Sequence, residues 1–213
     1  MITITLILVV MTALISYQAF TNQRMQDELS FRPAVIQEFG QWHRFFTAGF
    51  VHADWGHLIV NMIVLYQFGE FVEVFFREII FGSPMAGRIA FLLFYLSAIA
   101  ISCIPSYLRH RNNYAYGAIG ASGATSALLF AYVVINPWQM FAFPPLPAIL
   151  FGVFYLFYSS YMDRRGTDNI GHNQHFWGAV YGAAFILLAV QIYRPELFEV
   201  LLSRYQRIPF LTN

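Results

Sequence analysis

The stretch GASGATSALLFAYVVI, residues 120–135, begins as a polar turn and continues as an almost unbroken apolar run. An apolar run of this kind is typical of a helix that is buried in a membrane protein. Its entrance is unusual because a hydroxyl, that of Ser122, lies between Gly120 and Gly123. Polar side chains within membrane spans are costly and usually face the interior of the bundle, so Ser122 is a candidate functional residue.

The composition of the whole chain is that of a membrane protein. Of its 213 residues, 58% are hydrophobic and 11% are charged, whereas about 25% are charged in an average soluble protein. Spans of about 20 residues are predicted at residues 2–20, 56–76, 88–107, 118–136, 145–161 and 174–193. We therefore expect an all-α fold, a polytopic bundle of six transmembrane helices that forms a single membrane domain over residues 1–213.

The segments outside these spans differ in character. Residues 21–55 form a long first loop that is too polar to span and too apolar to be freely solvated, so we expect it to lie in the interface or to pack on the bundle. Residues 194–213 form a C-terminal tail whose pattern predicts an amphipathic interfacial helix. The net charge is only +1 and the arginines are spread over many loops, so nothing indicates a nucleic-acid partner.

Three of the predicted spans carry polar side chains near their beginnings. His57 and Asn61 are four residues apart in the second span and share a helix face, Ser122 begins the fourth span, and His175 begins the sixth. Helices 2, 4 and 6 of a six-span chain run in the same direction, so these side chains should lie at one depth near one membrane face. A hydroxyl, an imidazole and the free N–H groups of helix N-termini are the parts of an acyl-transfer site.

The spacing of small residues predicts how these helices pack. Gly178 and Gly182 follow His175 at helical spacing and allow another helix to approach closely. We expect them to meet the pair Ser122 and Ser126 on the fourth span. Near the far end of the second span, Glu73 and Arg77 are four residues apart, and this spacing predicts an ion pair.

Other site chemistries were weighed on the same residues. The histidines pair as His52 with His57 and as His172 with His175, but there is no HExxH motif and no carboxylate at ligand spacing within a span, so no metal and no cofactor are expected. Asp54 and Asp168 lie in loops near the proposed face, which leaves a Ser-His-Asp triad open beside the simpler Ser-His dyad. A channel or transporter would be expected to show internal repeats or broken helices, and the sequence has no fixed repeat.

Three motifs resemble those of rhomboid intramembrane serine proteases. They are HADWGHLIVNMIVLYQFG (52–69), GASGATSALLF (120–130) and HFWGAVYG (175–182), which are similar in this order to the family's HxxxN, GxSG and HxxGxxxG motifs. The resemblance implies an endopeptidase that hydrolyses peptide bonds in or near transmembrane segments of membrane-protein substrates. It also implies a multi-pass protein of the lipid bilayer, in the basic form found in the bacterial cytoplasmic membrane.

The resemblance also assigns roles to individual residues. Ser122 becomes the nucleophile and His175 the general base and then acid, while His57, Asn61 and the Ser122 N–H become the oxyanion donors. The glycines are the support of the site, with Gly120 giving access to the backbone and the others holding helices together: Gly120, Gly123, Gly178 and Gly182. The fifth span and residues 162–173 become a gate and cap through which a substrate enters.

Two positions depart from the family pattern. His43 separates Trp42 from Arg44, which the family has side by side, and Ser126 stands where several members have an aromatic that stacks on the catalytic histidine. The rival expectation is an inactive rhomboid-like protein that binds membrane clients. Loss of the serine or the histidine would be its simplest signature, and both residues are present.

Overall fold

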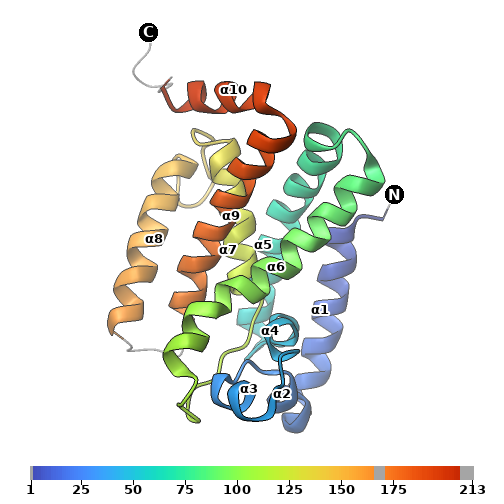
Figure 1. Cartoon of the computed structure of the whole chain (residues 1–213), viewed down its shortest axis with the longest axis vertical. Coiled ribbons are helices and arrows are strands. Elements are labelled where there is room, and N and C mark those ends of the chain that lie inside the picture. Colours follow the sequence, from blue (N-terminus) through green and yellow to red (C-terminus); the bar gives the residue numbers. More distant parts are fainter. Residues whose placement is uncertain (1, 166–170, 207–213) are drawn as a thin grey trace.

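The computed structural model describes residues 2–165 and 171–206, which fold as a bundle of helices (Figure 1). Each of the predicted spans forms a helix. These helices are α1 (Ile4–Phe20), α5 (Trp55–Val74), α6 (Pro84–His110), α7 (Ser122–Ile135), α8 (Ala148–Arg165) and α9 (His172–Tyr193). The shorter elements are α2 (Gln23–Leu29), α3 (Pro33–Phe39), α4 (Arg44–Thr47), η1 (Ala48–Phe50), η2 (Phe75–Ile80) and α10 (Pro195–Gln206). The prediction of an all-α bundle is confirmed.

The helices differ in length, and the short central one matters for the site. Among the described residues, Trp55–Ile80, Pro84–His110 and His172–Tyr193 are long and apolar enough to cross a membrane. Helix α7 has 14 residues, which span about 21 Å, less than the roughly 30 Å of a bilayer core. Its predicted start at residue 118 is wrong, because Gly120 has a φ of +117° that no helical residue adopts. Since α7 is almost wholly buried, its first residue lies within the bundle.

Helices α7 and α9 approach each other closely through two glycines of α9. A Cβ atom at Gly178 would collide with the backbone carbonyl of Gly123, and one at Gly182 with the carbonyl of Ala127. Backbone contact of this kind is what a GxxxG face permits. The packing places the beginning of α9 beside the beginning of α7.

The predicted partners of these glycines, Ser122 and Ser126, are wrong by one residue. The true partners follow each serine directly, and one residue corresponds to a rotation of about 100° around the helix. Small side chains without hydroxyls allow the closest approach, so Gly123 and Ala127 take the contact. The two serines line the neighbouring cleft instead.

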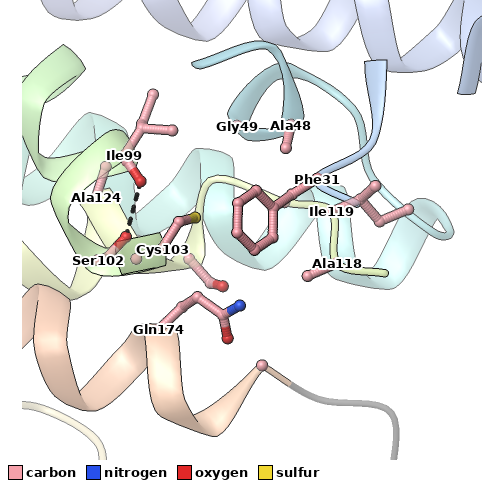
Figure 2. Close-up of a pocket in the computed structure, with 14 residues that line it drawn as sticks. Phe31, Ala48, Gly49, Ile99, Ser102, Cys103, Ala118, Ile119, Ala124 and Gln174 are labelled. Carbon is pink, nitrogen blue, oxygen red and sulfur yellow. Dashed lines mark hydrogen bonds between the residues drawn. The ribbon is translucent and has the colours of Figure 1, made fainter. Parts of the chain in front are cut away.

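The first loop packs back on the bundle. This was one of the two arrangements expected for it, the other being a position in the membrane interface. Its apolar residues form a core cluster with the far end of α6: Phe31, Ile36, Phe45, Ala48 and Cys103. Figure 2 shows Phe31 beside Cys103 in this cluster. The loop therefore covers the end of the bundle at which α7 begins.

Arg44 holds the first loop in its folded form. Its side chain is 7% exposed and donates to the carbonyls of Asp27 at 2.6 Å and Ser30 at 2.8 Å. Trp42, whose position departs from the family pattern, packs on Phe45 with ring centroids 6.0 Å apart. Although His43 separates them, Trp42 packs within the first loop and Arg44 forms hydrogen bonds within it.

The tail crosses the opposite end of the bundle as helix α10 (Figure 1). Arg204 donates to the carbonyl of Ile135 at 2.6 Å and the hydroxyl of Tyr205 donates to the carbonyl of Val134 at 2.9 Å. These bonds satisfy carbonyls in the last turn of α7, which the helix itself leaves free. The tail thus caps the central helix.

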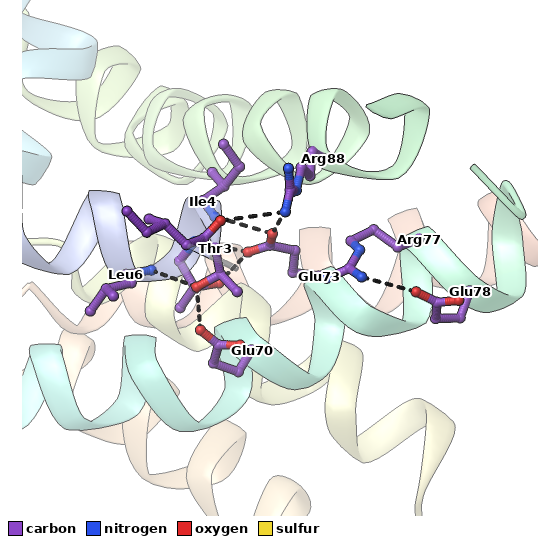
Figure 3. A network of polar contacts seen from close by, with 10 residues as sticks. Thr3, Ile4, Leu6, Glu70, Glu73, Arg77, Glu78 and Arg88 are labelled. Carbon is purple, nitrogen blue, oxygen red and sulfur yellow. Dashed lines mark hydrogen bonds and ion pairs between the residues drawn. The ribbon is translucent and has the colours of Figure 1, made fainter. Parts of the chain in front are cut away.

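Glu73, which is fully buried, caps the first helix of the chain (Figure 3). Its carboxylate accepts from the N–H groups of Ile4 at 3.1 Å and Thr5 at 2.8 Å and lies 3.8 Å from Nε of Arg88. The unpaired N–H groups at a helix start attract negative charge. One side chain therefore ties α5 to α1 and α6.

The predicted pair of Glu73 with Arg77 is wrong. Arg77 pairs with Glu78 at 3.0 Å. The helix changes from α to π geometry at Phe75, which alters the spacing of side chains around the axis. The carboxylate of Glu73 accepts hydrogen bonds from the start of α1 instead.

We expect Glu73→Ala to lower the free energy of unfolding by about 3–5 kcal/mol, because it leaves the partly buried Arg88 and two N–H groups without their acceptor. Glu78→Ala is the matched control, since its carboxylate is 57% exposed and such pairs contribute about 0–1 kcal/mol. Unfolding of both variants in detergent by heat or denaturant measures the difference. Equal losses of stability would contradict the capping role.

Candidate active site

A cleft of about 1250 Å³ lies between α5, α7, α8 and α9 and reaches the first loop. Its lining includes the four residues that the motifs singled out: His57, Asn61, Ser122 and His175. These side chains come from three helices. The first and the last of the four residues, His57 and His175, are more than a hundred positions apart in the sequence. The fold thus brings the four residues to one cleft.

Ser122 is the first residue of α7 and is half-buried. The N–H of Gly120 donates to the carbonyl of Ala48 at 2.9 Å, which anchors the turn before the helix. Ala121 at the N-cap supplies no side-chain hydrogen bond. The N-cap residue therefore does not cap the N–H groups of the first turn, and these groups favour negative charge beside Ser122.

Ser122 also lines part of a second, much smaller cavity, and Figure 2 shows this cavity from close by. Its volume is about 20 Å³, and its polar lining includes Ser102 and Gln174. Nε2 of Gln174 donates to the hydroxyl of Tyr116 at 3.0 Å, while its Oε1 has no hydrogen-bond partner within residues 2–165 and 171–206. The space suits about one water molecule, so a peptide substrate has to occupy the larger cleft.

His57 lies against the turn that leads to Ser122. Asp54 caps α5 by accepting from the N–H of His57 at 2.8 Å. A Cβ atom at Gly120 would come within 2.5 Å of Cε1 and 2.7 Å of Nε2 of His57. Only glycine permits this contact, and its positive φ is a second reason for glycine at this position.

Asn61 is 4% exposed and its amide orientation is defined by two bonds. Nδ2 donates to the carbonyl of His57 at 2.9 Å, and Oδ1 accepts from the hydroxyl of Thr125 at 3.0 Å. A carbonyl can only accept, so the nitrogen has to face it. One hydrogen of Nδ2 remains for a ligand in the cleft. The sequence showed Thr125 as a polar residue one turn after Ser122, but not this contact.

His52 is fully buried, and from the sequence it was considered only as one of a pair of histidines with His57. Its Nε2 accepts from the N–H of Ala121 at 3.2 Å, so its Nδ1 carries the hydrogen and donates to Ser16 at 2.9 Å. Burial lowers the pKa of His52 to about 3, in keeping with a neutral ring. The residue therefore holds the turn before Ser122, and its place in a loop gave no sign of this.

His175 lies in the first turn of α9 and is half-buried. The ring of Tyr155, from α8, stacks on it with centroids 6.2 Å apart and planes at 24°. The ring of His172 meets it edge-on at 5.8 Å. Several family members have an aromatic residue at the position of Ser126, where it stacks on the histidine. In this chain the aromatic neighbour of His175 comes from α8 instead.

The carboxylates considered for a triad have different positions. Asp54 acts as the N-cap of α5. Asp168 lies outside the described residues, which omit positions 166–170 of the predicted cap at 162–173. Within the described part of the chain, no group of three or more His, Cys, Asp or Glu side chains could hold a metal ion.

The comparisons with known proteins all point to one family. The Rhomboid domain family matches residues 39–192 of the chain. RHOMBOID-like protein 12, mitochondrial, of Arabidopsis thaliana is 28% identical over 154 residues, which cover 68% of this chain and 45% of that protein. Rhomboid-like protein 11, chloroplastic, of the same plant is 31% identical over 102 residues, or 48% of this chain and 32% of that protein. The chain thus matches less than half the length of either relative.

Proposed function

The chain belongs to the rhomboid family, and from this premise we propose that it is an intramembrane serine endopeptidase with a Ser122–His175 dyad. Its substrates in this proposal are membrane proteins, cut in or near their transmembrane segments. The observation that carries the proposal is the single cleft lined by Ser122, His175, His57 and Asn61. In this proposal residues 1–213 act as one membrane domain.

The reaction begins at the hydroxyl of Ser122. Its oxygen forms a bond to the carbonyl carbon of the substrate, while His175 takes the proton and the carbonyl electrons move to the oxygen. The resulting oxyanion accepts from the N–H of Ser122, from the remaining hydrogen of Asn61 Nδ2 and from His57. The hydrogen bond from Thr125 supports this role by fixing the amide of Asn61.

The intermediate then collapses to an acyl-enzyme. The C–N bond breaks as His175 donates its proton to the leaving nitrogen. A water molecule that loses a proton to His175 attacks the acyl carbon, and the proton returns to Ser122 when the ester bond breaks. No cofactor or metal takes part in these steps.

The apolar helices and the family make this an integral membrane protein. The names of the two relatives bear on which membrane holds the protein. The two relatives carry the words mitochondrial and chloroplastic in their names. These names do not support the bacterial cytoplasmic membrane that the sequence led us to expect.

Cleavage by the reconstituted protein tests the proposal. Wild-type protein in liposomes is mixed with single-span substrates that carry a different fluorescent tag at each end, with Ser122→Ala as the control. We expect two fragments with the wild type only, and mass spectrometry of the fragments locates the scissile bond. Stable co-purification of an uncut substrate with the folded wild type would favour the inactive client-binding protein instead.

A further inference from the structure

Tyr155 links the two members of the proposed dyad through its ring and its hydroxyl. The hydroxyl lies 2.5 Å from Oγ of Ser126, and Ser126 in turn lies one turn after Ser122 on α7. Oγ of Ser126 donates to the carbonyl of Ser122 at 2.7 Å. Because a serine hydroxyl has a single hydrogen, the hydroxyl of Tyr155 has to donate to Ser126.

The ring of Tyr155 covers one face of His175. The separation of 6.2 Å and the angle of 24° fall in the range of an offset aromatic stack, roughly 4.5–7 Å. The final torsion of a histidine side chain is broad and poorly defined by itself. A ring that is anchored at its far end and lies on the imidazole restricts that torsion.

We propose that Tyr155 is a positioning residue that orients the imidazole of His175 toward Ser122. The ring supplies the stack and Ser126 holds the ring in place. The inference rests on the proposed function, since it assigns an orienting role within the same dyad. Because Tyr155 belongs to α8, the orientation of His175 depends on where α8 lies.

The test replaces the ring and the hydroxyl separately. Tyr155→Leu removes the stack, whereas Tyr155→Phe and Ser126→Ala keep the ring and break its anchor. Phe154→Leu is the matched control, because Phe154 is the preceding residue of α8 and is 60% exposed. The kcat and KM for a single-span substrate in liposomes are measured for each variant after its folding has been verified by thermal unfolding.

We expect Tyr155→Leu to lower kcat about 10- to 100-fold with little change in KM, as for a misaligned catalytic group. Tyr155→Phe should lower kcat about three- to tenfold, the worth of one hydrogen bond. Ser126→Ala should lower kcat at least as much, because it also removes the bond to the carbonyl of Ser122. Their double variant should lose no more than Ser126→Ala alone, because Ser126→Ala already removes the bond that Tyr155→Phe breaks. A kcat for Tyr155→Leu equal to that of Phe154→Leu would overturn the inference.

A second measurement does not depend on catalysis. The ring of Tyr155 should shift the imidazole resonances of His175 upfield in protein with isotope-labelled histidine, and His175→Gln assigns those resonances. Tyr155→Leu should remove the upfield shift and Phe154→Leu should retain it. An absence of cleavage by the wild type refutes the proposed function, whereas unchanged His175 resonances in Tyr155→Leu overturn this inference by themselves.

Discussion

His175→Ala is expected to abolish the reaction of Ser122 with a fluorophosphonate probe. A serine hydroxyl is a poor nucleophile until a base takes its proton, and His175 is the proposed base in the cleft. In a well-studied serine protease, loss of either dyad member lowers kcat by a factor on the order of 10⁶. Labelling of the detergent-solubilised protein, followed on a gel over time, should therefore fall to background for His175→Ala and for Ser122→Ala.

The hydroxyl of Ser126 provides the control for this experiment. Ser126 is on the same helix and lines the same cleft, but its hydroxyl already donates to a carbonyl. Ser126→Ala should still be labelled, although more slowly. Labelling of the wild type should decline on acidification, because a protonated imidazole accepts no proton. Full labelling of a folded His175→Ala variant would refute the dyad.

Asn61→Ala is expected to lower kcat by about 10²–10³, the usual effect of removing one oxyanion donor. The reason is geometric: one hydrogen of its Nδ2 bonds to the carbonyl of His57, and the other is left for the substrate. Asn61→Asp should be at least as harmful, since it replaces the donor with a negative charge. The kcat and KM for a single-span substrate in liposomes measure both variants.

Thr125→Val separates the donor from its support. Valine has a similar shape and removes the hydrogen bond to Oδ1 of Asn61 together with the longer contact to the carbonyl of Ser122 at 3.2 Å, so we expect a smaller fall in kcat, about three- to tenfold. Turnover by Asn61→Ala equal to that of the wild type would remove Asn61 from the oxyanion role. A larger loss for Thr125→Val than for Asn61→Ala would also contradict it.

The sequence was sufficient for the features that depend on local pattern. Apolar segments of helical length predict the bundle, because burying backbone polar groups in lipid requires helices. The gathering of the candidate site residues in one cleft could be predicted as well. His57, Ser122 and His175 each stand at the beginning of a helix, and alternate helices of a bundle run in the same direction.

The contacts between helices were decided by the tertiary structure. Gly178 and Gly182 contact Gly123 and Ala127, each one residue after the predicted serine. Serine, glycine and alanine are all small, so the spacing of small residues does not distinguish the two pairs. Glu73 pairs with the start of α1 because that helix begins beside it in the folded bundle.

The candidate site likewise combines residues that the sequence identifies with residues that only the tertiary structure places there. Sequence motifs single out the residues proposed to react, because their types and spacing carry the chemistry. The residues that hold them come from elsewhere: Tyr155 reaches His175 from α8, and His52 reaches the turn before Ser122 from the first loop. Such contacts depend on the rotation and axial shift of each helix, which packing of the whole bundle determines and no local pattern records.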